Sequence, residues 1–490
     1  MRLAVPGLVL LTFLLLAMQG TFGAAANSPA VSSVVTGALH TCAVVAGQGY
    51  CWGENDSGQL GTGGTADSRS PVGVEELSPD VVEFALGEQH SCALHSNGSV
   101  HCWGYSEMIG QAPGSYLPVE VPDLQAGASS IDSQFWHTCA VMTDGSVKCW
   151  GYNGDGQLGG DCGLTMCASP VEATGLSEPI LNVAVSRRHT CALTDVGGVK
   201  CWGYNHFGYL GNGTTTASTS PVDVSGLTTD VDAIASGTFN SCALTTAGGV
   251  KCWGLDIDIT QSELSQSIYN TFLEPVDIPG LESGITAIAL GDLHGCALTE
   301  AGDVKCWGND ESGQLGDGGS AAPSTSVPVS VVDLPGPATA IAAGAFHTCA
   351  IVEGAEAVCW GQNSSGQLGD GTNATSNTPV TVLNWDPSPP KPTPTATTTP
   401  TLSPAPTATD TLTPTPTVTY TPQEGVGPGD VNCSDDVASI DALLTLQLIA
   451  ALLDALMCEG NADVNGGGID AVDALLILQF VAGLIDSLPP

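Results

Sequence analysis

Basic residues are nearly absent from this chain of 490 residues. Nine Lys and Arg stand against 50 Asp and Glu, so the formal net charge is −41. A surface this acidic repels phosphate backbones, which excludes nucleic acid as a partner. Long apolar runs are scarce as well, because no stretch after the N-terminal segment reaches the roughly 20 apolar residues that span a bilayer. We therefore expect no membrane span in the mature chain.

The N-terminal segment carries the features of an export signal. One Arg precedes an apolar run over residues 8–18, and small residues fill positions 23–26. This pattern predicts a secretory signal peptide over residues 1–26 and a secreted protein, extracellular or held at the cell surface. The 18 cysteines, an even count, fit this setting because oxidising compartments allow thiols to pair permanently.

The triplet CWG recurs seven times, at intervals of 51, 47, 52, 51, 54 and 53 residues. The units share one order, with substitutions in individual units: an apolar stretch, the motif G-x-x-H-x-C, a second stretch, a glycine-containing turn, V-x-CWG, a glycine-rich loop and P-V-x-V. Short strands with turn signals that repeat at about fifty residues indicate one sheet-like blade per unit. The repeats predict a mainly β fold, a seven-bladed β-propeller over residues 31–386.

Paired cysteines flank the hairpin that each unit predicts. Cys242 and Cys252 are equidistant from Ala247, so a hairpin that turns there places them opposite each other. Facing residues of an antiparallel pair have Cα atoms roughly 4.5 to 5.5 Å apart, a separation that a disulfide can bridge. The first unit has one residue fewer between its cysteines, as a two-residue turn requires. The predicted intrablade disulfides join Cys42 to Cys51, Cys92 to Cys102, Cys139 to Cys149, Cys191 to Cys201, Cys242 to Cys252, Cys296 to Cys306 and Cys349 to Cys359. A local disulfide is also expected between Cys162 and Cys167, which lie in one loop outside the pattern.

A histidine stands two residues before the first cysteine in six of the seven units, and Asn240 takes its place in the fifth. Alternate residues of a strand share a face, so His and Cys could contribute to a zinc site, which takes four ligands. The other interpretation is a repeated structural hydrogen bond from the imidazole to a neighbouring loop. The histidines are His40, His90, His137, His189, His294 and His347.

The units resemble the regulator-of-chromosome-condensation repeat, whose motifs are G-x-x-H-[ST], WG-x-N and GQLG. Intact GQLG begins at Gly58, Gly156, Gly313 and Gly366, and the resemblance extends over residues 31–386. It implies a seven-bladed propeller. The family includes a nuclear exchange factor for a small GTPase and secreted bacterial inhibitors of β-lactamase, so the resemblance alone leaves the function open. Export and acidity argue for the secreted bacterial type.

Two units depart from the repeat after CWG. The second reads YSEMIGQAPGSYLPV and the fifth reads LDIDITQSELSQSIYNTFLEPV. Loops that depart from a regular scaffold commonly carry binding residues, and drift without function is the alternative. The aromatic candidates for a binding face are Tyr105, Tyr116, Tyr269 and Phe272, together with Phe135 and Trp136 of the third unit.

The positions of the few basic residues are informative. Arg187 and Arg188 directly precede His189 and join the candidate binding face. Four consecutive units also carry a lysine just before the second cysteine. A propeller would bring these lysines into an arc that could meet an acidic partner or an anionic glycan; alternatively, each one keeps an exposed strand soluble. They are Lys148, Lys200, Lys251 and Lys305.

The composition changes abruptly after the repeats. Residues 387–422 contain 11 Pro and 14 Thr, which predicts an extended linker over residues 387–428. Beyond it, GDVNCSDDVASIDALLTLQLIAALL is echoed by ADVNGGGIDAVDALLILQFVAGLI. Each copy places an acidic, Asn-containing loop before an apolar-rich helix, which is the arrangement of a calcium loop that leads into a helix.

The two copies resemble a dockerin, a duplicated calcium-binding module that attaches exported proteins to cohesin-bearing scaffolds. The resemblance implies a small α-helical domain over residues 429–490, bound Ca²⁺, and a cohesin-like or other exported partner. The implied ligands are Asp430, Asn432, Ser434, Asp436 and Asp441 in the first loop, and Asp463, Asn465 and Asp473 in the second. The second loop is one residue short, so the first is expected to bind calcium more tightly. Cys433 and Cys458 would join the first loop to the segment after the first helix.

We expect an exported, non-enzymatic recognition protein. Its propeller would bind a protein or a cell-wall glycan, and its tail would dock onto a cohesin-type partner. The alternative is a carbohydrate-active enzyme, a polysaccharide hydrolase or lyase, because dockerins commonly carry such cargo. The sequence shows no Ser, His and Asp arrangement and no phosphate-binding loop. A catalytic carboxylate pair is rarely visible in a single sequence.

Overall fold

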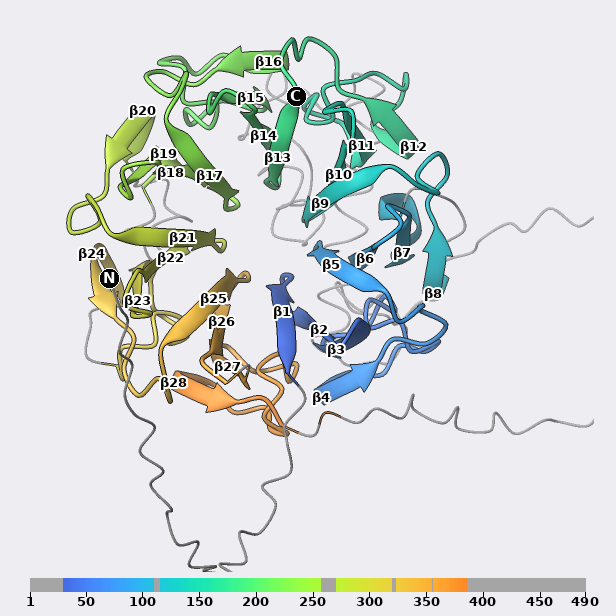
Figure 1. Cartoon of the computed structure of the whole chain (residues 1–490), viewed down its shortest axis with the longest axis vertical. Coiled ribbons are helices and arrows are strands. Elements are labelled where there is room, and N and C mark those ends of the chain that lie inside the picture. Colours follow the sequence, from blue (N-terminus) through green and yellow to red (C-terminus); the bar gives the residue numbers. More distant parts are fainter. Residues whose placement is uncertain are drawn as a thin grey trace, which may run out of the picture. The chain divides into compact units, whose positions relative to one another are not determined.

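Seven four-stranded antiparallel sheets form a ring, and each sheet is built from four consecutive strands (Figure 1). We number the sheets blade 1 to blade 7 in chain order. The computed structural model describes residues 30–109, 115–256, 270–319, 323–354, 356–383 and 385. The predicted seven-bladed propeller is confirmed. The predicted signal peptide, linker and calcium-loop domain lie outside the described residues.

The first strand of every blade points toward the centre of the ring (Figure 1). These innermost strands are β1 (Val31–Thr36), β5 (Val81–Leu86), β9 (Ala128–Gln134), β13 (Ile180–Val185), β17 (Val231–Ser236), β21 (Ile285–Leu290) and β25 (Ala338–Ala343). The second strands all begin at the histidine position or at its Asn substitute. They are β2 (His40–Val45), β6 (His90–His95), β10 (His137–Met142), β14 (His189–Thr194), β18 (Asn240–Thr245), β22 (His294–Thr299) and β26 (His347–Val352).

The third strand of every blade carries CWG, and the fourth forms the outer edge. The third strands are β3 (Gln48–Gly53), β7 (Val100–Gly104), β11 (Val147–Tyr152), β15 (Val199–Gly203), β19 (Val250–Leu255), β23 (Val304–Asn309) and β27 (Glu356–Gly361). The outer strands are β4 (Ser68–Gly73), β8 (Ser115–Glu120), β12 (Met166–Glu172), β16 (Ser218–Asp223), β20 (Thr271–Asp277), β24 (Ser324–Ser330) and β28 (Ser376–Thr381).

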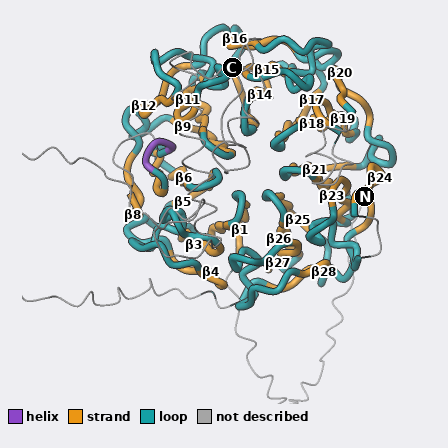
Figure 2. The backbone as a smooth tube through the Cα atoms, turned by 180° about the vertical axis from the view of Figure 1, so that it is seen from behind, coloured by secondary structure: helices purple, strands orange, loops and turns teal. Residues whose placement is uncertain are grey.

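Helix is confined, within the described ranges, to the single 3-10 turn η1 (Ser106–Met108) in the irregular loop of blade 2 (Figure 2). No helix in this part of the chain is long and apolar enough to cross a membrane. Elsewhere in the described residues, loops and hairpin turns connect the strands. Sheet alone therefore supplies the scaffold on which the candidate site is built.

The hairpin register is the one that the cysteine spacing predicts. Cys242 faces Cys252 with Cα atoms 4.0 Å apart, and the other six intrablade disulfides form in the same way. In blade 1 the shorter spacing is taken up by a two-residue turn, in which Ala46 and Gly47 both have positive φ. The local disulfide between Cys162 and Cys167 also forms. The predicted pairing is thus confirmed for every cysteine in the described residues.

The hydrophobic core lies between neighbouring blades. Trp103 of blade 2 is fully buried and packs in one cluster with the Cys42–Cys51 disulfide and Leu60 of blade 1. The same arrangement recurs around the ring, with each CWG tryptophan packed against the preceding blade. A blade alone would expose both its disulfide face and its indole, so the blades stabilise one another in the manner of stacked repeats.

The ring closes without exchange of a strand between the first and last blades, since β1 to β4 form blade 1 and β25 to β28 form blade 7. Closure depends instead on the loop of blade 7 that contains GQLG. Its Gln367 carbonyl accepts hydrogen bonds from Trp52 Nε1 and Thr41 Oγ1 of blade 1, both at 2.9 Å. The amide of Gly371 donates to the carbonyl of Arg69 on β4 at 2.9 Å. Within the described residues, blade 7 is therefore joined to blade 1 by non-covalent contacts alone.

Candidate partner-binding site

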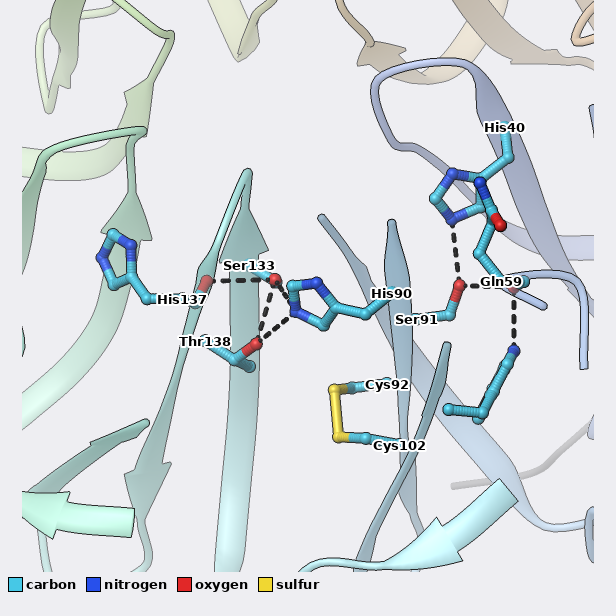
Figure 3. The surroundings of a disulfide bond; sticks show 10 residues. His40, Gln59, His90, Ser91, Cys92, Cys102, Ser133, His137 and Thr138 are labelled. Atoms are coloured by element: carbon cyan, nitrogen blue, oxygen red, sulfur yellow. Dashed lines mark hydrogen bonds between the residues drawn. A yellow bond between two sulfur atoms is a disulfide. The ribbon is translucent and has the colours of Figure 1, made fainter. Parts of the chain in front are cut away.

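The histidine position forms a hydrogen-bonded link between blades (Figure 3). His40 Nε2 lies 2.9 Å from Ser91 Oγ in blade 2, and the Ser91 hydroxyl donates to the Gln59 carbonyl of blade 1 at 2.7 Å. A hydroxyl has one proton, so His40 must carry its proton on Nε2 and donate it to Ser91. Trp103 Nε1 donates to the same carbonyl at 2.8 Å. Blade 1 is thus joined to blade 2 by three linked hydrogen bonds.

All six histidines make this kind of bond to a hydroxyl of the next blade. The other pairs are His90 with Thr138 at 2.8 Å, His137 with Thr190 at 2.9 Å, His189 with Ser241 at 2.7 Å, His294 with Thr348 at 2.9 Å and His347 with Thr41 at 2.9 Å. Burial lowers the pKa of each imidazole to about 3, so all six are neutral.

These bonds confirm the structural interpretation of the histidines, with one correction: the acceptor is a strand hydroxyl and not a loop. The zinc alternative is wrong, because the adjacent cysteines are bound in disulfides and cannot act as ligands. No group of three or more His, Cys, Asp or Glu within the described residues could hold a metal ion.

The boundary between blades 5 and 6 lacks both members of this link. Asn240 occupies the histidine position, and Gly295 stands where every other blade has Ser or Thr. Asn240 Oδ1 is buried without a hydrogen-bond partner. A Cβ atom at Gly295 would lie 2.6 Å from Cζ2 of Trp307, so the indole fills the space that a hydroxyl side chain would need. The ring of histidine bonds therefore has one gap, where donor and acceptor have changed together.

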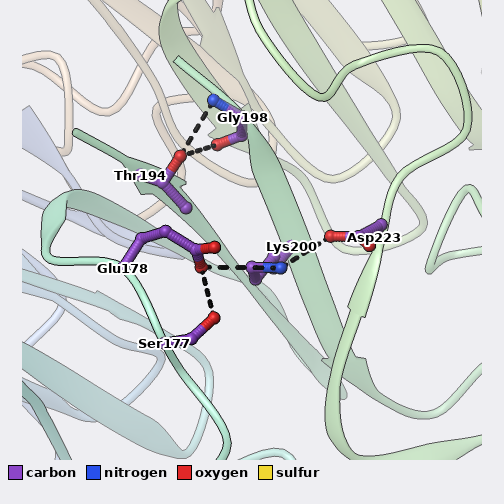
Figure 4. A network of polar contacts seen from close by, with 6 residues as sticks. All are labelled: Ser177, Glu178, Thr194, Gly198, Lys200 and Asp223. Atoms are coloured by element: carbon purple, nitrogen blue, oxygen red, sulfur yellow. Dashed lines mark hydrogen bonds and ion pairs between the residues drawn. The ribbon is translucent and has the colours of Figure 1, made fainter. Parts of the chain in front are cut away.

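Two of the four lysines of the arc form ion pairs with carboxylates beside their own strands. Lys200 Nζ lies 2.6 Å from Asp223 and 3.7 Å from Glu178 (Figure 4). Lys251 Nζ lies 2.6 Å from Asp277. Both aspartates end outer strands that pair directly with the lysine strands. For Lys200 and Lys251, these contacts favour the interpretation in which each lysine serves its own strand.

Arg187 and Arg188 lie in the loop between β13 and β14 and occupy an aromatic environment. Arg187 Cζ is 4.7 Å from the ring centroid of Phe135 and 5.4 Å from that of Trp136. Both distances are within the range of cation–π contacts. The structure thus places Arg187 against the two aromatic residues of blade 3 that the sequence singled out beside the irregular loops.

The second arginine is fixed in place by a carboxylate. Arg188 Nε and one terminal nitrogen bind the two oxygens of Asp155 at 2.7 and 2.9 Å. The guanidinium also lies over the ring of Tyr204, with Cζ 3.9 Å from the centroid. A bidentate pair of this kind holds the side chain in one orientation and compensates its charge.

A cavity of about 300 Å³ opens beside the two arginines, in the region where blades 3, 4 and 5 meet. We call it the aromatic–arginine pocket. Planar side chains form most of its wall, and both arginines line it. The residues that define it here are Trp136, Tyr152, Arg187, Arg188, Tyr204 and Phe239. Apolar walls with a few fixed polar groups are typical of ligand and partner sites, and Trp, Tyr and Arg are the residues enriched at interface hot spots.

The other predicted binding residues do not join this pocket. Tyr105 and Tyr116 of blade 2 are 43% and 49% exposed. The ring of Tyr116 lies over Gly58 of blade 1, where a Cβ atom would approach Tyr116 Cδ1 to 2.3 Å. Phe272 lines a separate hollow beside β20 with Leu273, and Tyr269 lies outside the described residues. Blades 2 and 5, which carry the two irregular loops in sequence, are not neighbours in the ring (Figure 1).

Sequence reasoning missed five aromatic residues that line the pocket: Tyr152, Tyr204, Phe207, Tyr209 and Phe239. A signal was present for the three of them in the fourth unit. The fourth unit reads CWGYNHFGYLG, with three aromatic residues across a loop in which units one, six and seven carry none. Phe207 and Tyr209 pack near Tyr204 in tilted ring contacts, with centroids 5.7 Å apart in the pair Phe207–Tyr209 and 5.9 Å apart in the pair Tyr204–Tyr209. The aromatic residues in the regular loop of the fourth unit therefore indicated the aromatic–arginine pocket better than the irregular loops of the second and fifth units.

The centre of the ring holds a second cavity, of about 520 Å³, lined by the innermost strands. Burial raises the pKa of both Glu83 and Asp132 there to about 7. Each carboxylate accepts a main-chain N–H from the next blade: Ile131 N lies 3.2 Å from Glu83, and Val185 N lies 2.6 Å from Asp132. These groups therefore satisfy amides on the free inner edge of a sheet, which is a structural role.

The fold and the repeat motif define the protein as a seven-bladed propeller built from fifty-residue units, with a partner-binding surface as its candidate site. The chain belongs to the family of the regulator of chromosome condensation (RCC1) repeat. The repeats match at residues 46–94, 197–244 and 301–351, and in a second form at residues 81–108, 132–157, 180–208, 285–314 and 338–367.

Curated relatives and solved structures agree with this assignment. The chain is 30% identical over 361 residues to the RCC1 domain-containing protein RUG3, mitochondrial, of Arabidopsis thaliana. The aligned region covers 71% of this chain and 68% of the relative. It is 28% identical over 361 residues to the Ultraviolet-B receptor UVR8 of the same plant, with 71% and 81% covered. The crystal structure of Prp20p from Saccharomyces cerevisiae superposes with a TM-score of 0.60 at 20% identity, over 73% of this chain and 88% of that one.

Proposed function

We propose that the protein is an exported, non-enzymatic recognition protein whose propeller binds a partner protein through the aromatic–arginine pocket. One observation carries this proposal: aromatic side chains from three blades and two adjacent arginines line a single cavity in a chain with only nine basic residues. Planar aromatic and guanidinium groups lose little conformational entropy on binding, which suits them to an interface.

The family supports a role in protein binding. Prp20p, which shares the fold, has binding properties toward Gsp1p and histones, and a further solved structure contains Kap60 bound to yeast RCC1 (Prp20). These partners belong to those proteins, and we draw from them only that a propeller of this kind can present a protein-binding face. A cell-wall glycan is the second kind of partner that such a face could take.

Export and docking complete the proposal and rest on sequence alone. The signal-peptide pattern supports secretion of bacterial type, to the extracellular space or the cell surface. The duplicated acidic loops support a dockerin-like tail that binds Ca²⁺, more tightly at the first loop, and docks onto a cohesin-like partner. The Pro- and Thr-rich linker would allow the propeller and the tail to engage their partners independently.

The test is a capture experiment with the full-length chain, immobilised and exposed to secreted proteins and cell-wall glycans. Trp136→Ala and Tyr204→Ala should each reduce capture of a protein partner at least tenfold, because truncation of a central aromatic residue costs about 2 kcal/mol or more at a hot spot. Tyr105→Ala is the matched control, since it removes an exposed aromatic side chain from another blade. A partner lost with Tyr105→Ala and retained by both pocket variants would refute the assignment of the pocket.

The alternative function, a polysaccharide hydrolase or lyase, has Glu83 and Asp132 as its best candidates, because their raised pKa values are suited to proton transfer. Their hydrogen bonds to main-chain amides make the structural role the better account. Turnover of a polysaccharide that is abolished by Glu83→Gln or Asp132→Asn would favour the enzyme.

A further inference from the structure

The two arginines of the pocket differ in what their donors contact. Arg188 donates two hydrogen bonds to Asp155 in a bidentate pair. Arg187 makes face contacts with Phe135 and Trp136, and among the described residues its guanidinium has no hydrogen bond or ion pair. Stacking occupies the faces of a guanidinium and leaves its N–H donors, which lie in the plane, available. Arg187 is therefore a positioned cation with unused donors.

Nearby acidic groups do not neutralise Arg187. Burial raises the pKa of Asp292 to about 6, and the nearby charge of Arg187 only partly opposes this rise. Asp292 forms no ion pair with Arg187 and instead accepts a hydrogen bond from Thr238 Oγ1 at 2.6 Å. Glu88 accepts from Trp136 Nε1 at 2.6 Å. Both carboxylates are held by neighbours on the loops of other blades. A carboxylate that arrives from outside would thus find the arginine free.

We propose that Arg187 binds an acidic side chain, Asp or Glu, of the partner protein, while the aromatic wall of the pocket takes an adjacent apolar or aromatic side chain. This inference rests on the proposed function and specifies the chemistry of the partner. An arginine that presents two parallel N–H donors matches the two oxygens of a carboxylate, and its weak hydration lowers the cost of removing water. The apolar part of the pocket beside Arg187 has room for a second side chain, so we expect an apolar or aromatic residue next to the acidic residue in the partner.

The net charge of the chain affects how an acidic segment binds. With a net charge of −41, the protein repels an acidic segment at long range, so a single short-range contact must overcome that repulsion. Added salt screens the repulsion between distant charges more than it weakens a close, partly desolvated pair. Binding of the acidic segment should therefore strengthen, or stay constant, as the salt concentration rises from a low value.

The test uses the full-length chain and two peptide probes that differ in one group: acetyl-Glu-Phe-amide and acetyl-Gln-Phe-amide, measured by ligand-observed NMR. The wild-type protein should bind the carboxylate probe about tenfold more tightly, as expected for a hydrogen bond to a charged group. Arg187→Gln should abolish this preference, and Arg187→Lys should restore only part of it. Lys251→Gln, which removes a positive charge paired within blade 5, is the control and should change nothing.

Each other outcome overturns the inference. Equal affinity for the two probes, or failure to bind either, excludes a carboxylate at this site. A preference that survives Arg187→Gln assigns it to another residue. Binding of polygalacturonate that depends on Arg187, without binding of the peptide, would show that the partner is an acidic glycan. If Trp136→Ala abolishes partner capture while both probes bind equally, the proposed function stands and only the carboxylate inference fails.

Discussion

The contact between blade 7 and blade 1 offers a sharp test of how the ring is held closed. Thr41 is fully buried at this contact, and its hydroxyl binds both His347 Nε2 and the Gln367 carbonyl at 2.9 Å. Thr348 makes the same two bonds, at the same 2.9 Å, between blades 6 and 7, to His294 Nε2 and the Gln314 carbonyl. The two threonines differ in one respect: a continuous chain joins blade 6 to blade 7.

Thr41→Val and Thr348→Val each replace the hydroxyl by a methyl group of similar volume. Each removes two hydrogen bonds and leaves an imidazole N–H buried without an acceptor. The carbonyl keeps its bond from Trp52 or Trp360, both at 2.9 Å. Because an unsatisfied buried donor costs about 1 to 3 kcal/mol, we expect either variant to lose about 2 to 3 kcal/mol of unfolding free energy.

Urea denaturation should therefore give nearly equal losses for the two variants, whereas native-state hydrogen exchange should separate them. Thr41→Val should speed exchange in β1, β2, β26 and β27, because blades 1 and 7 can part without the whole ring unfolding. Thr348→Val should leave that local exchange close to wild type. Identical exchange patterns in the two variants, or a loss below about 0.5 kcal/mol in Thr41→Val, would refute this account of closure.

Four further predictions concern two titrating groups, one disulfide and the calcium loops. Burial lowers the pKa of His347 in the folded state from 6.5 to about 3. Between these two pH values the imidazole is protonated in the unfolded state and neutral in the folded state. Stability should fall as the pH falls through this window, by about 1.4 kcal/mol per pH unit for each such histidine, and His347→Asn should flatten the slope measured by urea denaturation. Glu83 has the opposite sign, since its pKa is raised from 4.5 to about 7 and its contribution is lost as the pH rises; Glu83→Gln should be more stable than wild type at pH 8 and not at pH 4. Replacement of Cys349 and Cys359 by Ala, a pair separated by 10 residues, should lower the unfolding free energy by roughly 2 to 3 kcal/mol, and an unchanged value would exclude a stabilising disulfide there. Calorimetry on the full chain should show that Asp441→Ala removes most calcium binding and Asp473→Ala little, and the reverse result would contradict the predicted inequality of the loops.

The fold could be predicted from the sequence because its determinants are local. The distance from Cys242 to Cys252 fixes the centre of a hairpin, and the hairpin fixes which cysteines face each other. Every such inference spans about ten residues and depends only on the geometry of two paired strands. The number of repeats then gives the number of blades, and this step does not depend on how the blades pack.

The binding pocket could not be predicted in the same way, because its members come from different units. Trp136 and Arg187 are 51 residues apart and meet only because the ring places blade 3 beside blade 4. The irregular loop of blade 2 suggested a binding face instead, but its Tyr116 covers Gly58 of blade 1. A departure from the repeat can thus serve packing against a neighbour as readily as it serves a partner.

The gap in the ring of histidine bonds limits how the blades can be rearranged. Every other blade offers a hydroxyl to the blade before it and an imidazole to the blade after it, so with respect to this contact those blades are interchangeable. Blade 5, moved alone, would leave the hydroxyl of its new neighbour without an imidazole at Asn240. Blade 6, moved alone, would bring Gly295 against an imidazole with no acceptor. An engineer who shuffles, duplicates or deletes repeats in this protein should therefore treat blades 5 and 6 as one indivisible module of about a hundred residues.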